Sequence, residues 1–230
     1  MEHGYISENL RAVRENIDAV KRRLGIEREI TVVAAVKYAD ADEIRYLCSE
    51  CGVRELGENR VQQLLEHYEA LGGLDVGWHF IGTLQTNKVK YIADKVCMIH
   101  SVDSVRLARE IDRQAKKHGR VIDVLVEINS GAEENKSGVL PEEAEALCLE
   151  ISQLENIKLR GFMTMAPRCE KKEDYIKYFS QTYAKSLDIW TKKLHNISRP
   201  IISMGMSDSY GEAIECGADI VRIGRSLFIK

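Results

Sequence analysis

Residues 30–37 read Ile30-Thr-Val-Val-Ala-Ala-Val-Lys37, and this stretch decides the fold class of the chain. It is rich in β-branched residues and carries no charge before the lysine, which is typical of a parallel strand buried on both faces. A polar segment, residues 38–42, follows at once and marks the carboxyl end of the strand. We therefore expect an α/β fold with Lys37 on the rim of its sheet.

The same strand pattern recurs along the chain, and helical patterns separate its copies. The strand candidates are residues 30–36, 53–56, 78–82, 96–101, 122–128, 159–163, 200–204 and 219–223. The helical candidates between them are residues 41–51, 59–71, 87–92, 104–118, 141–154, 175–194 and 210–216. Strands and helices in this alternation favour a closed (β/α)8 TIM barrel. An open Rossmann-type sheet would need a glycine-rich turn after its first strand, and residues 36–40 contain no glycine.

One further helical segment, residues 6–24, precedes the first strand. Apolar residues recur in it at helical spacing from Leu10 to Leu24, with charged residues between them, and Gly25 ends it. We expect an additional N-terminal amphipathic helix and a single domain over residues 1–230.

The composition excludes several classes of partner. Thirty-three basic residues against thirty-six acidic ones give a net charge of −3, so no cationic field attracts nucleic acid or anionic lipid. No apolar stretch has the length of a membrane span, and the first ten residues lack the layout of a signal peptide. These features predict a cytoplasmic protein without nucleic-acid or membrane partners.

The six cysteines are scattered along the chain. Cys48 and Cys51 have the spacing of half a zinc site or of a redox pair, but no second such pair and no histidine pair accompanies them. We expect reduced thiols and no metal site.

Lys37 is the first candidate for chemistry. Apolar surroundings at a strand end disfavour the ammonium form and leave a lone pair that can attack an aldehyde. This position favours a Schiff-base lysine, either for a carbonyl substrate or for pyridoxal 5'-phosphate (PLP). The alternative is a lysine that only extends its ammonium group from a strand end into water.

Other candidates follow the carboxyl ends of the remaining strands, which meet at one mouth of a barrel. The turn after the seventh strand and the glycine after the eighth form a phosphate cradle, with Ser207 donating from its hydroxyl and residues 224–225 from their amides. Arg222 lies within the last strand, where its charge must be paired or must face a ligand. His79 is either a site residue or a core histidine. The residues that we expect at a PLP site are Lys37, Asn59, His79, Met163, Ser203, Ser207, Arg222, Gly224 and Arg225.

Several motifs, in collinear order over nearly the whole chain, resemble the pyridoxal phosphate homeostasis protein family, which is related to the N-terminal barrel of alanine racemase. They are Ala35-Val-Lys-Tyr38, Gly57-Glu-Asn-Arg-Val-Gln62, Trp78-His-Phe-Ile-Gly-Thr-Leu-Gln-Thr-Asn-Lys88, Lys136-Ser-Gly138, Gly161-Phe-Met-Thr-Met165, Ser203-Met-Gly-Met-Ser-Asp208 and Val221-Arg-Ile-Gly224. The resemblance implies a PLP-bound barrel in which Lys37 forms the aldimine. It places Arg222 at the ring nitrogen and Ser207, Gly224 and Arg225 at the phosphate. Relatives commonly have threonine or serine where this chain has Arg225, so a hydroxyl contact is replaced by a guanidinium.

The resemblance implies a protein that carries or buffers PLP in vitamin B6 and amino-acid homeostasis. The alternative is an amino-acid racemase of the alanine racemase type. Racemisation needs a base on each face of the substrate, and alanine racemases take the second base, a tyrosine, from an additional β-domain that we do not expect in this chain. We therefore predict a non-catalytic PLP binder, with weak racemase-like or transamination activity at most. We also expect it to be a monomer that can pass PLP to apo-enzymes.

Overall fold

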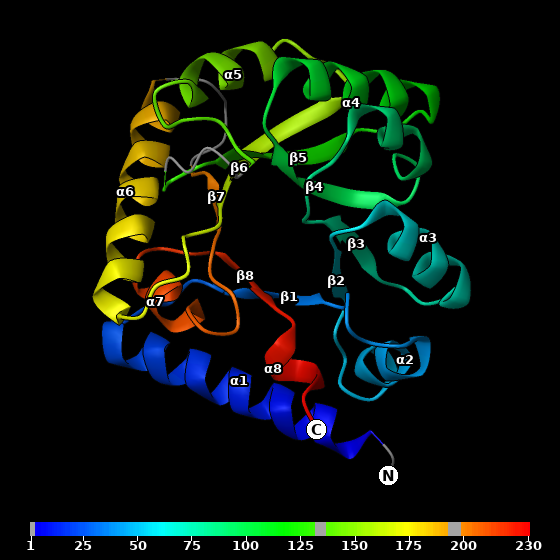
Figure 1. Ribbon diagram of the computed structural model, residues 1–230, viewed down its shortest axis with the longest axis vertical. Helices are drawn as coiled ribbons and strands as arrows, with labels where there is room; N and C mark the ends of the chain where they lie inside the picture. The colour runs from blue at the N-terminus through cyan, green and yellow to red at the C-terminus, as the bar shows by residue number, and fades with distance from the viewer. Residues whose placement is uncertain (1–2, 132–136, 193–198) are drawn as a thin grey trace.

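The computed structural model of the protein describes residues 3–131, 137–192 and 199–230. Eight parallel strands close into a barrel in the order of the sequence, and the helices surround it (Figure 1). The predicted TIM barrel is confirmed. The strands are β1 Thr31–Ala35, β2 Glu55–Glu58, β3 Gly77–Phe80, β4 Val96–Val102, β5 Ile122–Ile128, β6 Ile157–Thr164, β7 Ile201–Ser203 and β8 Ile220–Ile223.

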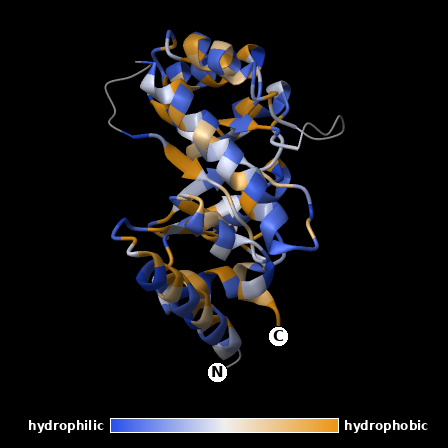
Figure 2. Cartoon of the chain, turned by 90° about the vertical axis from the view of Figure 1, so that its left-hand side faces the viewer, coloured by the Kyte–Doolittle hydropathy of each residue, from blue (hydrophilic) through white to orange (hydrophobic). Residues whose placement is uncertain are grey.

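The N-terminal amphipathic helix is also confirmed, as α1 Gly4–Leu24, and it lies beside the last two helices of the chain (Figure 1). Hydrophobic and hydrophilic residues alternate along α1 near the N-terminus in Figure 2, and its apolar face is buried from Ile6 to Val20. The other helices are α2 Ala41–Ser49, α3 Val61–Ala70, α4 Val105–Lys117, α5 Ala144–Ile151, α6 Lys172–Thr191, α7 Tyr210–Glu215 and α8 Arg225–Phe228. None of these described helices is both long enough and apolar enough to cross a membrane.

Some predicted boundaries are wrong. The segment predicted as a helix over 87–92 is a 3₁₀ helix, η1 Thr86–Tyr91. The second strand begins and ends two residues later than predicted, so β2 includes Gly57 and Glu58. The four-residue α8 is too short to give a periodic pattern. The predicted end of the helix over 175–194 lies partly outside the described residues.

The core has two layers. A small cluster fills the barrel itself, and a larger one packs the outer faces of the strands against the helices. The buried apolar side chains of this small cluster are Val33, Met98, Leu125, Met163 and Ile220. No disulfide joins the six cysteines, all of which lie in the described part of the chain.

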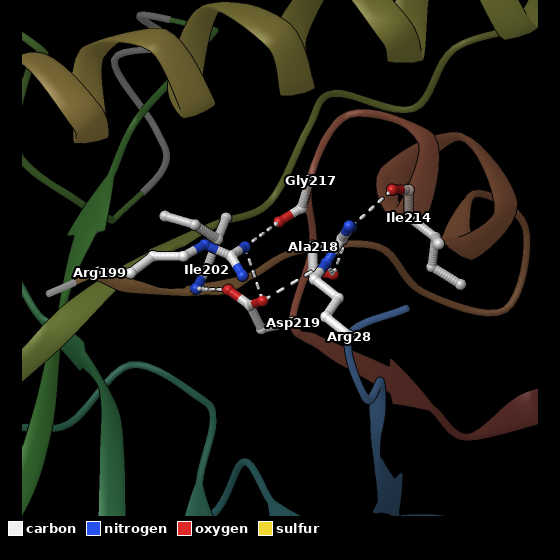
Figure 3. Close-up of polar contacts among 7 residues, drawn as sticks. All are labelled: Arg28, Arg199, Ile202, Ile214, Gly217, Ala218 and Asp219. Carbon is white, nitrogen blue, oxygen red and sulfur yellow. Dashed lines mark hydrogen bonds and ion pairs between the residues drawn. The ribbon is translucent and has the colours of Figure 1, made fainter. Parts of the chain in front are cut away.

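A polar cluster holds together the segments that enter the barrel at its amino-terminal end (Figure 3). The Oδ1 atom of Asp219 lies 2.8 Å from Nη2 of Arg199 and 3.5 Å from Nε of Arg28. The other carboxylate oxygen accepts from the amide of Ile202 at 2.9 Å. Because these residues lie just before β1, at the start of β7 and just before β8, the cluster fixes three strands at this end.

Candidate functional site

A cavity of about 230 Å³ opens at the carboxyl-end mouth of the barrel. Its wall comes from the segments that follow β1, β2, β3, β6, β7 and β8. Six of the nine predicted site residues line it: Lys37, Asn59, Ser207, Arg222, Gly224 and Arg225. Six lining residues were not predicted as site residues, and all of them end or follow strands that the sequence predicts: Ala35, Tyr38, Ile81, Met165, Met206 and Asp208.

Lys37 is held by its backbone, while its side chain lines the cavity. Its carbonyl accepts a hydrogen bond from Nε2 of Gln63 at 3.0 Å. The lysine is half-buried, and its Nζ lies 4.8 Å from the centre of the exposed Tyr38 ring. The amine is therefore positioned at the mouth of the barrel without an ion pair to hold it among the described residues, and it can reach a ligand in the cavity.

Arg222 is a buried cation on the cavity wall and is only 3% exposed. Its Nη1 donates to Oγ of Ser203 at 2.8 Å, and its Nη2 donates to the carbonyl of Thr164 at 3.0 Å. Burial lowers the pKa of Arg222 to about 10, while the nearby Glu127 carboxylate favours the charged form. The guanidinium therefore remains protonated at neutral pH, and its orientation is fixed by the barrel interior.

The other three predicted site residues, His79, Met163 and Ser203, lie below the cavity in the barrel interior and do not line it. Two of them belong to a continuous hydrogen-bonded chain. From Ser203 this chain passes to Nδ1 of His100 at 3.0 Å, from Nε2 of His100 to Nδ1 of His79 at 2.8 Å, and from Nε2 of His79 to Oε2 of Glu55 at 2.7 Å. Ser203 and His79 thus act on the cavity only through Arg222.

The two histidines differ in protonation. Burial opposes a charge on His79, but hydrogen bonds with Cys97 and Glu55 outweigh it and raise the pKa of His79 to about 9. Burial, together with the charges of His79 and Arg222, lowers the pKa of His100 well below its ordinary value. A neutral His100 between two cations accepts at Nε2 from His79 and donates at Nδ1 to Ser203. The protonated His79 thus donates on both sides, to Glu55 and to His100, and Ser203 accepts from both His100 and Arg222.

A turn rich in small residues also lines the cavity. The hydroxyl of Ser207 accepts from the amide of Ser226 at 3.2 Å, which joins the turn after β7 to the start of α8. Gly224 precedes α8, and a Cβ atom there would lie 2.9 Å from the carbonyl oxygen of Ala35. Gly205 adopts a φ of 90°, which side chains disfavour, and its carbonyl accepts from the amide of Arg222.

The guanidinium of Arg225 is already engaged. It forms an ion pair with Asp208, and both side chains are exposed. This pair competes with the contact to phosphate that the sequence analysis expected from the Arg225 side chain. The amide of Arg225, the first in α8, has no acceptor within the helix and remains suited to an anion, whereas the amide of Ser226 donates to Ser207.

The residues present fit PLP. Asn59 offers a further indication, because the residue lines the cavity and its buried Oδ1 atom has no hydrogen-bond partner in the described structure. A buried acceptor without a donor is uncommon and suits a ligand that supplies one. One wall thus combines a primary amine, a buried cation, an unsatisfied acceptor and an anion-binding turn. Lys136, which belongs to one of the motifs, lies outside the described residues.

Comparisons with known proteins agree with these features. The family model described as alanine racemase, N-terminal domain, matches residues 9–230. The pyridoxal phosphate homeostasis protein of Aquifex aeolicus is 45% identical over 222 residues, which are 96% of this chain and 96% of that protein.

Solved structures place the fold in the same group. PipY of Synechococcus elongatus PCC7942, in a structure with PLP bound, superposes with a TM-score of 0.84 at 28% identity, over 97% of this chain and 100% of that one. An alanine racemase of Clostridium difficile superposes with a TM-score of 0.71 at 22% identity, over 94% of this chain and 56% of that one, and so shares the fold. The chain therefore belongs to the pyridoxal phosphate homeostasis protein family, whose barrel is that of the alanine racemase N-terminal domain.

Proposed function

We propose that this protein binds PLP in the cavity at the carboxyl ends of its strands and carries or buffers the cofactor. The observation that carries the proposal is the shared cavity wall of Lys37, Arg222 and the Ser207 turn. The PLP-bound structure of PipY, a neighbour that aligns along nearly the entire chain, supports it.

Each residue has a distinct role in this proposal. When bound, PLP supplies an aldehyde and an electron-withdrawing ring. The amine of Lys37 bonds covalently to the aldehyde carbon, with loss of water. Ser207 and the amides of Gly224 and Arg225 hold the phosphate, and Arg222 faces the ring nitrogen. Asn59, on the cavity wall, orients the cofactor. The hydrogen-bonded chain through Ser203 and His79 orients Arg222.

The same geometry favours a carrier over an enzyme. A charged Arg222 at the ring nitrogen keeps that nitrogen unprotonated, which weakens the ring as an acceptor of electrons from a substrate. Among the described residues that line the cavity, Tyr38 is the one tyrosine, and it is 68% exposed beside Lys37. A wall open to water also weakens electrostatic catalysis. We propose a monomer that releases PLP to, or exchanges it with, PLP-dependent apo-enzymes.

The proposal is tested by the absorption spectrum of the purified protein with PLP. The wild type should show a visible band that borohydride abolishes, and mass spectrometry should then place the reduced cofactor on the peptide that contains Lys37. Lys37→Ala should lose the band. Lys90→Ala, which alters an exposed lysine of η1, should keep it. A band retained in Lys37→Ala would contradict the proposed attachment.

The racemase remains the second candidate, because Tyr38 stands next to Lys37 and the fold is shared with alanine racemase. It is tested by incubating the PLP-loaded protein with a panel of L- and D-amino acids and measuring their interconversion. Turnover of about 1 per second or more would be typical of an enzyme and would contradict the carrier function.

A further inference from the structure

We propose a second ligand site at the opposite mouth of the barrel, where Glu55, His79 and Cys97 bind a thiophilic divalent cation of the zinc class. The site is separate from the proposed PLP cavity and does not depend on it. Among the described residues these three side chains form a group whose ligand atoms all lie within 4.8 Å of one another.

Three consecutive strands bring the ligands together. Glu55 begins β2, His79 lies in β3, and Cys97 is the second residue of β4. A register shift between β3 and β4 pairs Trp78 with Val96 but His79 with Met98, so Cys97 is the extra residue of a bulge. Bulges at barrel rims redirect side chains, and here the thiol is directed toward the histidine and the carboxylate.

The sheet also leaves room for these side chains. A Cβ atom at Gly77 would lie 2.5 Å from Oε2 of Glu55 and 3.2 Å from Sγ of Cys97. Any larger residue at this position of β3 would therefore displace both groups. The absence of a side chain at Gly77 allows a carboxylate and a thiol to occupy the same corner of the mouth.

The donor set matches the preferences of zinc. One sulfur, one imidazole nitrogen and one carboxylate oxygen leave a fourth tetrahedral position for water. Binding would replace the hydrogen bond of 2.7 Å between His79 and Glu55 with two bonds to the metal. It would release the proton on Nε2 of His79 and the thiol proton of Cys97. Glu55 and Cys97 are accessible from solvent, which gives the cation a path to the buried histidine.

The surroundings of the site already orient the ligands. Nδ1 of His79 is hydrogen-bonded to Nε2 of His100 at 2.8 Å, and Cys97 donates to the carbonyl of Trp78 at 3.3 Å. Metal-binding histidines commonly use their second nitrogen in this way, because the contact fixes the ring. The chain from His100 to Ser203 and Arg222 connects this mouth to the other one.

The test uses the full chain, reduced and freed of metal by a chelator, and titrates it with Co²⁺. The wild type should develop a thiolate-to-cobalt charge-transfer band that saturates at one equivalent and that Zn²⁺ abolishes by competition. Cys97→Ser should lose the band, whereas Cys216→Ser, which removes a partly buried thiol elsewhere, should retain it. Since Cys97 is exposed, we expect its substitution to leave the fold intact.

A second variant isolates the carboxylate. Glu55→Gln should weaken Zn²⁺ binding, measured by calorimetry, at least about tenfold. Lys37→Ala should bind the metal as the wild type does, so failure of the PLP proposal would not affect this result. An unsaturable titration, or a band of equal strength in Cys97→Ser, would overturn the metal site.

Discussion

The orientation of single side chains decides what the cavity can bind, and Arg222 illustrates why. Its two terminal nitrogens are fixed by Ser203 and by a backbone carbonyl, so the guanidinium cannot turn away from the cavity. Ser203 is in turn fixed by His100. A buried hydrogen-bonded chain of this kind is favourable only when each member has its partner. The orientation of Arg222 is therefore fixed before a ligand binds, by residues of the barrel interior that do not line the cavity.

Ser207→Ala removes a hydroxyl from the proposed phosphate site. We expect it to weaken PLP binding by about 1–3 kcal/mol, since a charged acceptor loses one donor. Pyridoxal, which lacks the phosphate, should bind poorly to the wild type and be nearly indifferent to the change. Fluorescence titration with both ligands measures the difference. Ser226→Ala is the matched control, because residue 226 contributes only its amide to Ser207. Equal losses for both ligands would place the phosphate elsewhere.

Arg222→Glu reverses the charge at the proposed ring-nitrogen position. A carboxylate can hold a proton on that nitrogen, so exchange of the Cα proton of added amino acids should become faster, while PLP should be retained less well. Proton NMR in deuterated water measures the exchange. Arg222→Lys, which keeps the charge, should leave exchange slow. Fast exchange in the wild type that collapses in Arg222→Glu would show a site built for catalysis.

At the scale of secondary-structure elements, the sequence predicts the helices and strands whose apolar residues recur at a regular spacing. It does not predict features that depend on contacts between neighbouring strands. All eight strands and α1 follow from apolar runs and helical spacing, because burial selects those residues. The four-residue α8 and the bulge at Cys97 have no such pattern. The same distinction holds at the site. Six predicted residues line the cavity because they end or follow strands that the sequence predicts. His79 does not line it, because it is hydrogen-bonded to partners on neighbouring strands in the barrel interior.

The turn that carries Lys37 ends in a helix cap that can be tested. The side chain of Asp40 accepts from the amide of Glu43 at 2.8 Å, and the side chain of Glu43 accepts from the amide of Asp40 at 3.0 Å. Asp40→Ala removes the N-cap of α2, so we expect it to lower the free energy of unfolding by about 1 kcal/mol. Urea denaturation measures the change. Asp42→Ala, in the same exposed first turn, should change it by less than about 0.5 kcal/mol. Similar losses in both variants would argue against the cap.

At the scale of the whole molecule, the barrel must be closed between its last and first strands. β8 pairs with β1 over four residue pairs, from Thr31 with Ile220 to Ala34 with Ile223. β7, by contrast, pairs with β8 through a single register position. The Asp219 cluster lies where these strands begin and links the segment before β1 to both of them (Figure 3). Side chains thus supplement the short backbone ladder between β7 and β8.

Asp219→Ala tests this closure. The substitution leaves Arg28 and Arg199 without their carboxylate and the amide of Ile202 without its acceptor, so the free energy of unfolding should fall by about 1–3 kcal/mol. Asp188→Ala is the matched control, because it removes an exposed acid of α6 whose ion pairs with lysines contribute little. Urea denaturation of both variants without PLP gives the comparison. The PLP affinity of folded Asp219→Ala should equal that of the wild type, since the cluster lies at the amino-terminal end of the strands and the cavity at the other. An unchanged stability would mean that the backbone ladder alone closes the barrel, and a lost affinity would mean that the two ends of the strands are coupled.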